Sequence, residues 1–191
     1  MSKIPEITVH GRFQPPLHIN HWQYIKSGFD LANHVEVLIT NPFQDEGYDA
    51  AASWRNDPAN NPFSYEERIW MFGQFFTRMG ISPEKYGFRP FNIKEDSSFA
   101  ELNPKLPNLV NVYSEWSAKK VEAFESHGLS VIRLDQPKSR PVSGTLIRQI
   151  IFEDSDRAQL PNRLIDAGFM PEAVPGLLEV LDKRETKSSG A

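Results

Sequence analysis

The chain has 191 residues, 39% of them hydrophobic, which suits one compact domain and leaves little room for a second. A formal net charge of -4 excludes a general basic surface for nucleic acid, although a local cationic site remains open. Cysteine is absent, which excludes disulfides, thiolate chemistry and cysteine zinc sites. No run approaches the roughly 18 apolar residues of a membrane helix. We therefore expect a cytoplasmic protein with neither nucleic acid nor membrane as a partner.

The first forty residues read as a strand, a helix and a second strand. In chain order they are expected at 4–9, 18–31 and 35–40. Pro15 and Pro16 prevent a helix from crossing the first turn. This order implies a parallel pair of strands with a right-handed crossover. The long polar stretch 41–62 is predicted to be a loop that covers a substrate.

A helix is expected to follow this loop. Ser64 and Glu67 have the spacing of a capping box, and Gly80 ends the periodic pattern. Apolar residues recur at helical spacing, which predicts a core face rather than a cofactor site. They are Ile69, Met71, Phe72, Phe75, Phe76 and Met79.

The remaining chain alternates strands and helices and then becomes helical. Further strands are expected at 88–93, 109–114 and 130–134, with a polar connection at 94–108 and helices at 115–126, 149–152, 161–167 and 171–181. The fold class is therefore α/β: a Rossmann-like, doubly wound parallel sheet of about five strands, with helices on both faces and a helical C-terminal end. Residues 1–182 are predicted to form a single domain, and 183–191 a flexible tail.

The first chemical motif is the turn Gly11-Arg12-Phe13-Gln14-Pro15-Pro16-Leu17-His18-Ile19-Asn20-His21. It joins a strand to a helix, and ligands of open α/β sheets bind at the carboxyl ends of strands. A helix N-terminus there attracts phosphate oxygens. His18 and His21 are three residues apart, so a helix that starts at this point presents them on one face.

The second motif is Arg140-Pro141-Val142-Ser143-Gly144-Thr145-Leu146-Ile147-Arg148. Ser143 is a suitable helix cap, and Gly144 permits close approach of a phosphate to the backbone. Thr145 and Arg148 share one helix face, and Arg140 adds a cation on the same loop. An ordinary capped helix with a surface arginine is the alternative.

The first motif resembles that of the HxGH nucleotidyltransferase superfamily, and most closely the archaeal-type nicotinamide mononucleotide (NMN) adenylyltransferases, whose motif opens Gly-Arg-Phe-Gln-Pro. The family has glycine between its histidines, whereas this chain has Asn20. The segment from Ser143 to Arg148 is similar to the superfamily's triphosphate-binding Ser-x-Thr-x-x-Arg motif. Residues 61–68 resemble the family's Asn-Pro-Phe-Thr-x-x-Glu-Arg. The resemblance covers roughly residues 4–182.

The resemblance implies transfer of a nucleotidyl group from a nucleoside triphosphate to a phosphate-bearing acceptor, with Mg²⁺ carried by the triphosphate and no metal site on the protein. It implies that His18 and His21 bind the α-phosphate and that Arg12 and Arg148 bind the β- and γ-phosphates. These four residues are the expected catalytic groups. The full nucleotide-binding set is Gly11, Arg12, Phe13, Gln14, His18, His21, Arg140, Ser143, Gly144, Thr145 and Arg148.

The acceptor candidates come from the end of the second strand and the loop after it, from the start of the following helix, and from the segments on either side of the fourth strand. The candidates are Thr40, Asn41, Asn61, Arg68, Phe99, Tyr113 and Trp116. Phe99 is expected where the family has a tryptophan that stacks on nicotinamide, and Trp116 could supply that ring or pack in the core. For Arg68 the alternative is an exposed arginine paired with a carboxylate.

Three functions follow from the resemblance. The first is transfer from ATP to NMN, giving NAD. The chain reads Tyr-Ser-Glu-Trp at 113–116 where the family has Tyr-Ser-Asn-Asn, and Thr-Asn-Pro at 40–42 where the family has Gly-Ser-Ala-Gln. These departures keep open a CTP-dependent cytidylyltransferase acting on a small phosphate or phosphonate. A catalytically inactive, nucleotide-binding regulatory domain is the third. The apolar run at 177–181 could serve a homo-oligomer or pack within the chain.

Overall fold

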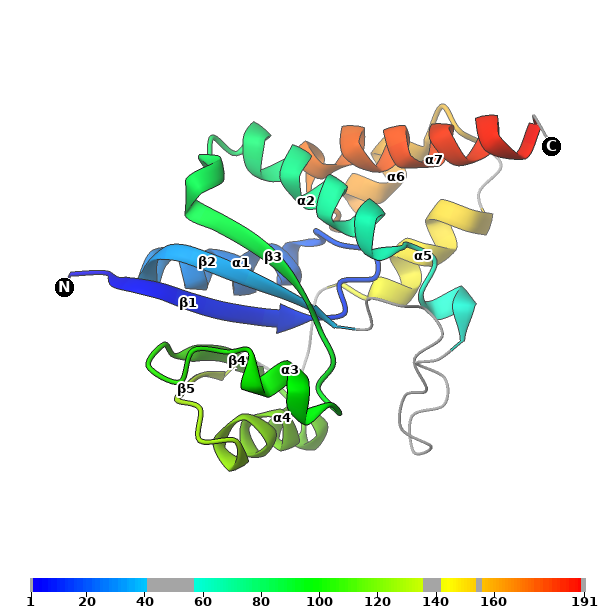
Figure 1. The fold of residues 1–191 in the computed structure, drawn as a ribbon. Coiled ribbons are helices and arrows are strands. Elements are labelled where there is room, and N and C mark those ends of the chain that lie inside the picture. The colour runs from blue at the N-terminus through cyan, green and yellow to red at the C-terminus, as the bar shows by residue number, and fades with distance from the viewer. Residues whose placement is uncertain (1, 41–56, 136–141, 154–155, 190–191) are drawn as a thin grey trace. The chain divides into compact units, whose positions relative to one another are not determined.

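The structure is a computed structural model that describes residues 2–40, 57–135, 142–153 and 156–189 (Figure 1). The chain forms two compact units. The first, here called the sheet unit, comprises Met1–Arg12, Gln23–Pro42 and Pro83–Arg140. The second, the helical unit, comprises Phe13–Trp22, Phe43–Ser82 and Pro141–Ala191.

The described part of the sheet unit contains one five-stranded parallel sheet. Its strands are β1 (Ile4–Gly11), β2 (Ala32–Thr40), β3 (Tyr86–Phe91), β4 (Asn108–Val112) and β5 (Val131–Asp135). Their order is β3-β2-β1-β4-β5, and every neighbouring pair is parallel. The prediction of a Rossmann-like α/β fold is confirmed. Because the order reverses beside β1, the carboxyl ends of β1 and β4 lie at the position where such sheets bind ligands.

The two faces of β1 carry different layers of the core. Ile7 and Val9 face helix α1 (Ile19–Leu31), and Gly28 lets that helix approach, since a Cβ at Gly28 would lie 3.1 Å from the Cγ1 atom of Val9. On the other face Thr8 Oγ1 donates to Asn108 Oδ1 at 2.6 Å. A core cluster there packs under helix α4 (Glu115–Ser126), which Figure 1 shows along β4 and β5.

The connection between β3 and β4 differs from its prediction. The residues expected as a polar link include a short helix, α3 (Asp96–Ala100), which follows β3 after four residues. Phe99 of this helix is only 3% exposed, and its ring packs against Phe91 and Phe124. The aromatic ring therefore completes the core, which the polarity of its neighbours concealed. β4 also ends earlier than expected, because Ser114 caps α4 instead of continuing the strand.

The helical unit is built from helices and short turns. Its described elements are η2 (Pro58–Asn60), α2 (Tyr65–Arg78), α5 (Gly144–Glu153), α6 (Leu160–Asp166), η4 (Pro171–Ala173) and α7 (Val174–Ser189), while η3 (Pro83–Lys85) belongs to the sheet unit. Helices α2 and α7 lie side by side (Figure 1). A Cβ at Gly176 would lie 3.2 Å from the Cβ of Gln74, so glycine permits this close packing.

Helix α2 begins as the sequence predicts. Ser64 Oγ accepts from the N–H of Glu67 at 3.2 Å, and Glu67 Oε2 accepts from the N–H of Ser64 at 2.9 Å. Met71, Phe72, Phe75 and Phe76 are buried, which confirms these four residues of the predicted core face, whereas Ile69 and Met79 are partly exposed.

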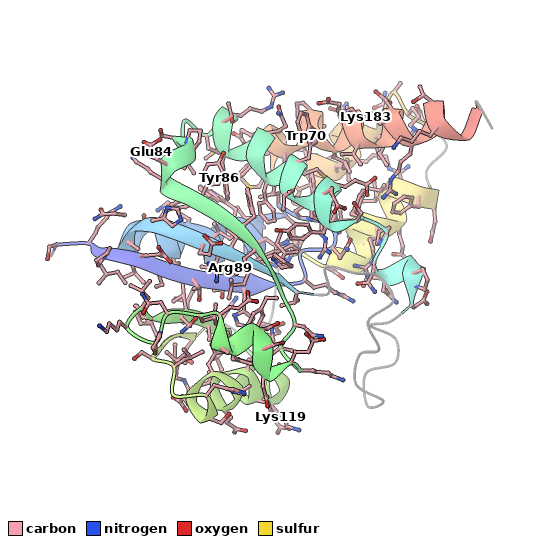
Figure 2. The ribbon with its side chains drawn as sticks, viewed as in Figure 1. Trp70, Glu84, Tyr86, Arg89, Lys119 and Lys183 are labelled. Atoms are coloured by element: carbon pink, nitrogen blue, oxygen red, sulfur yellow. The ribbon has the colours of Figure 1, made fainter. Side chains whose placement is uncertain are left out.

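Helix α7 continues to Ser189, where the sequence predicts a flexible tail from Lys183. Arg184 Nε donates to Glu67 Oε1 at 2.6 Å, and Arg184 Nη2 donates to the Pro62 carbonyl. The ammonium of Lys183 lies 4.5 Å from the ring centroid of Trp70, and Figure 2 labels both residues on their adjacent helices. These contacts join α7 to α2 and to Pro62 ahead of it, in a segment whose composition alone indicates fraying.

The apolar run of the last helix packs inside its own unit. Leu177, Val180 and Leu181 are each less than 5% exposed. Intramolecular packing thus accounts for this face, and assembly into a homo-oligomer stays a prediction. Among the described residues, no helix has both the length and the apolar character needed to cross a membrane. Most of the predicted substrate-covering loop, 41–56, lies outside the described residues.

Candidate active site

The turn after β1 has a constrained backbone. Phe13 and Leu17 have positive φ angles of 49° and 74°, and the Gln14–Pro15 peptide is cis. Non-glycine residues in the left-handed region cost about 1–3 kcal/mol each and cluster at functional sites. The surrounding structure must therefore hold this turn in place.

The side chain of Gln14 supplies much of that support. Its Nε2 donates to the Phe63 carbonyl at 2.7 Å, and its Oε1 accepts from the Phe63 N–H at 3.1 Å. Gln14 is 4% exposed, so both bonds are shielded from water. This two-point bond fixes the turn to the segment that leads into α2.

The two motif histidines stack on each other at the start of α1. The ring centroids of His18 and His21 are 3.6 Å apart with 26° between planes, and the Phe13 ring meets His21 edge-on at 5.0 Å. The backbone on either side is held by the C-terminal part of the unit. The Ile19 N–H donates to Gly168 O at 2.9 Å, and the Met170 N–H donates to Leu17 O at 3.0 Å.

The second motif forms the start of α5. Ser143 Oγ accepts from the Thr145 N–H at 3.2 Å, and Ser143 O accepts from the Ile147 N–H at 3.2 Å. Ser143 thus acts as the predicted cap. The remaining N–H groups of the first turn make a favourable environment for an anion.

The two motifs meet at Gly144. A Cβ placed there would lie 3.2 Å from the Gln14 carbonyl oxygen, 3.6 Å from Arg148 Nη1 and 3.9 Å from His18 Nε2. An imidazole, a guanidinium and a helix N-terminus therefore surround one point. This is the arrangement that binds and neutralises phosphate groups.

Asn20, which stands at the motif glycine, joins the same two segments. Its Nδ2 donates to the Val142 carbonyl at 3.0 Å, and the side chain is 5% exposed. The bond connects the first turn of α1 to the residue that precedes the Ser143 cap.

Arg148 is held by three hydrogen bonds within the described residues and is only 7% exposed. Nη1 donates to Gln14 O at 2.7 Å, and Nη2 donates to Asn60 Oδ1 at 2.8 Å and to Thr145 Oγ1 at 3.1 Å. Burial lowers the pKa of the guanidinium from its ordinary value.

A pocket of about 370 Å³ opens beside these groups, within the size range of small-molecule sites. It is lined by Ala59, Asn60, Pro62, Thr145, Arg148, Gln149, Phe152 and Glu153. Asn60, Thr145 and Arg148 are joined by hydrogen bonds within this lining, Gln149 and Glu153 are also polar, and Ala59, Pro62 and Phe152 are apolar. The pocket can accept a charged group that carries a less polar part.

Several predicted residues lie at the carboxyl edge of the sheet unit. Gly11 ends β1, and Arg12 follows it directly. Thr40 is the last residue of β2, and Tyr113 follows β4, with its N–H donating to Ser117 Oγ at 2.8 Å. These four residues come from the strand ends at which ligands of such sheets bind.

Other acceptor candidates are buried. Arg68 and Asn61 are 0% exposed; Arg68 Nε donates to Ser64 O at 3.1 Å, and Asn61 Nδ2 donates to Asp57 O at 3.1 Å. Arg68 is thus not the exposed arginine of the alternative interpretation. Phe99 belongs to the core. Asn41, Arg140 and the side chain of Trp116 lie outside the described residues.

Sequence reasoning missed two residues. Asn60 binds Arg148, and the only hint was the turn signal of Asp57-Pro58 ahead of it. His10 is 4% exposed between Phe124 and Phe91, and neither ring nitrogen has a hydrogen-bond partner among the described residues. The sequence alone does not indicate whether a histidine within an apolar strand is buried or exposed.

The chain is 32% identical over 150 residues to the phosphonoformate cytidylyltransferase of Streptomyces viridochromogenes, and the match covers 76% of this chain and 79% of that protein. The chain belongs to the same nucleotidyltransferase family. It is therefore an enzyme, a nucleotidyltransferase, and the interpretation as an inactive regulatory domain is not supported. No family model matches the chain.

Solved structures agree on the fold of this nucleotidyltransferase. Two crystal structures of a bifunctional NMN adenylyltransferase/ADP ribose pyrophosphatase from Francisella tularensis, one complexed with AMP and manganese, each superpose with a TM-score of 0.57. Their identities are 18% and 17%, over 78% and 97% of this chain and 42% and 55% of those chains. The nucleotidyltransferase therefore spans about half of those bifunctional proteins, and the likeness shows the fold alone.

Proposed function

We propose that this nucleotidyltransferase transfers CMP from CTP to a small phosphonate or phosphate acid and releases pyrophosphate. The observation that carries the choice of CTP is the 32% identity to a phosphonoformate cytidylyltransferase across about four fifths of both chains. The sequence departures at 40–42 and 113–116 support it too, because they lie where an acceptor would be recognised.

The reaction is a displacement at phosphorus. An anionic oxygen of the acceptor forms a bond to the α-phosphorus of CTP. The bond from that phosphorus to the oxygen bridging the β-phosphate breaks, and its electron pair leaves with pyrophosphate. Since the attacking oxygen is already an anion, the site has to align the reactants and neutralise charge rather than remove a proton.

The groups around Gly144 suit this task. His18 and His21 would donate hydrogen bonds to oxygens of the α-phosphate as negative charge shifts towards the bridging oxygen. Arg148, Thr145 and the first N–H groups of α5 would bind the departing pyrophosphate. The proposal is supported by the 3.6 Å and 3.9 Å separations that bring Arg148 and His18 to one point at Gly144.

The remaining assignments are part of the proposal. Arg12 would bind phosphate from the end of β1, and Gly11 and Phe13 would shape the turn. Arg140 would add charge ahead of α5. Mg²⁺ would arrive with CTP as part of the substrate. Thr40 and Tyr113, at the carboxyl edge of the sheet, are the acceptor contacts that the proposal retains, because Phe99, Asn61 and Arg68 are buried.

Transfer from ATP to NMN is the second candidate. It is favoured by the resemblance of residues 11–15 and 61–68 to NMN adenylyltransferase motifs. Against it, Phe99 is 3% exposed and packs on Phe124, so this ring is not free to stack on nicotinamide.

Pyrophosphate release tests the two candidates together. The full chain is incubated with each of the four nucleoside triphosphates and Mg²⁺, against NMN, phosphonoformate and a panel of small phosphates and phosphonates. Release with CTP and a phosphonate or phosphate acid, and none with ATP and NMN, supports the proposal. Release with ATP and NMN alone would replace it with the second candidate.

A further inference from the structure

The guanidinium of Arg148 has five N–H donors, and three of the five make hydrogen bonds within the described residues. These bonds go to Gln14 O, Asn60 Oδ1 and Thr145 Oγ1. The Nε–H and the second Nη1–H are not used in them. The three acceptors are neutral, so the arginine keeps its full positive charge while its orientation is fixed.

Asn60 offers its oxygen from a rigid turn. Asp57 Oδ1 accepts from the Ala59 N–H at 2.9 Å, and Asp57 O accepts from the Asn60 N–H at 2.8 Å. Pro58 fixes its own φ at the first position of this turn. An acceptor held in this way orients a partner at little entropic cost.

The segment after Asn60 is fixed on both sides. The Phe63 N–H donates to the Gln14 side chain, and the Phe63 carbonyl accepts from it. The Pro62 carbonyl accepts from Arg184. The position of Asn60 relative to Arg148 therefore depends on contacts from three separate parts of the helical unit. Asn60, Thr145 and Arg148 also line the same pocket.

We propose that Asn60 is a positioning residue for the nucleotide: it holds the Arg148 guanidinium so that its charge and unused N–H groups are directed at the phosphates of the triphosphate. This inference rests on the phosphate-binding role that the proposed function gives to Arg148, and it does not depend on which base is used. Thr145 supports the same orientation from within α5.

The test combines single variants with a double-mutant cycle in the full chain. Asn60→Ala removes the acceptor, and Asn60→Asp keeps an oxygen but adds a carboxylate that neutralises Arg148. Arg148→Met keeps the apolar stem and removes the guanidinium, which limits packing damage. Triphosphate affinity is measured by calorimetric titration, KM and kcat by pyrophosphate release, and folding by urea denaturation. Asn162→Ala, on the exposed side of α6, is the matched control.

Asn60→Ala is expected to weaken triphosphate binding and raise its KM about fivefold, the equivalent of one hydrogen bond, with less than a twofold change in acceptor KM. Asn60→Asp should weaken binding further, because charge is lost as well. In the Arg148→Met background, Asn60→Ala should add less than twofold, since a residue that acts through Arg148 has nothing left to position.

If Asn60→Ala weakened triphosphate binding equally in the wild-type and Arg148→Met backgrounds, the inference would be overturned. A change in acceptor KM alone, or an unchanged triphosphate affinity, would also overturn it. The titration uses all four triphosphates. If the wild type bound ATP and not CTP, the proposed choice of CTP would be contradicted. The affinities and KM values of the Asn60 variants would then be compared with ATP as the triphosphate.

Discussion

The Nδ2 atom of Asn20 donates a hydrogen bond of 3.0 Å to the carbonyl oxygen of Val142. The two residues are far apart in the chain, and the bond joins the histidine turn to the segment ahead of α5. The archaeal-type NMN adenylyltransferases, which the motif resembles, have glycine at this position, and glycine has no side chain to donate this hydrogen bond. Asn20 therefore adds a cross-link between the two motifs where the family relies on a small residue.

Replacing Asn20 by alanine should lower the free energy of unfolding by about 1 kcal/mol, because a buried carbonyl loses its donor. Urea denaturation measures the change. Asn162→Ala is the control, because this exposed residue makes only a 3.4 Å bond to Gln159. Equal stability of the two variants would contradict a structural role for the Asn20 bond.

Gly144→Ala should reduce activity more than stability. The added methyl group would lie 3.2 Å from Gln14 O, so the turn or α5 must shift by a few tenths of an ångström. Misplacement of catalytic groups by about 1 Å costs roughly a hundredfold in rate, so we expect a loss of about tenfold in kcat. Gly73→Ala is the matched control in α2, where a Cβ meets nothing within 4 Å. That variant should keep full activity and gain about 0.5–1 kcal/mol. Full activity of Gly144→Ala would argue that no reacting group lies beside this glycine.

Much of this arrangement was readable from residue patterns. The capping residues Ser64 and Ser143 and the parallel strands follow from local chemistry and from topology, whereas the pairing of the two motifs in one site is what the family resemblance implies. The bonds of Asn20, Asn60 and Gln14 could not be predicted, because each joins segments that only the folded chain brings together.

Errors in the prediction also have physical causes. Phe99 was expected near a ligand, but the short helix α3 directs its ring into the core. Arg184 belongs to a charged stretch that reads as a frayed end, yet its guanidinium binds Glu67 and orders α7. In both cases a tertiary contact overrides the local composition.

Acid should destabilise the protein partly through His10. Burial, and next the positive charge of Lys120, hold the pKa of His10 well below its ordinary value of 6.5. Below that pH the unfolded chain binds a proton that the folded chain does not, so stability falls as pH falls, by at most about 1.4 kcal/mol per pH unit. His10→Leu should remove this contribution and flatten the curve between pH 7 and 5. Urea denaturation at several pH values measures it, and curves of equal slope for wild type and variant would rule it out.

His127 provides a control of opposite sign. Its backbone bond to Ala123 and its bond to Asp96 raise the pKa of this exposed imidazole. Its stabilising contribution is present below the unfolded pKa and is lost as pH rises through the folded pKa. His127→Gln should therefore change the pH dependence in the direction opposite to His10→Leu.

Arg184→Ala should destabilise the protein at neutral pH and not in acid. Burial alone would raise the pKa of Glu67, but hydrogen bonds from Arg184 and from the Ser64 N–H outweigh it and lower the pKa below 4.5. The stability gained from this pair is present above pH 4.5 and is lost as pH falls through the pKa of the folded state.

Both side chains of this pair are partly exposed, so we expect a loss of about 0.5–1 kcal/mol at pH 7 for Arg184→Ala. Arg184→Lys, which keeps the charge but not the two-pronged geometry, should lose part of this. Thermal or urea unfolding at pH 7 and pH 3 measures both variants. An equal loss at the two pH values would show that packing of the arginine stem, not the ion pair, is responsible.

Transfer of label from α-phosphate-labelled CTP to a phosphonate acid, in wild type and in His18→Ala, tests the central claim most directly. We predict a labelled phosphonate–CMP product with wild type, and a rate about 100-fold or more lower with His18→Ala, as for the loss of one donor to a developing charge. CTP affinity should change by much less than the rate. An undiminished rate in the variant would contradict the role of His18. Absence of a CMP product from the wild type, with NAD formed from ATP and NMN, would contradict the proposed function.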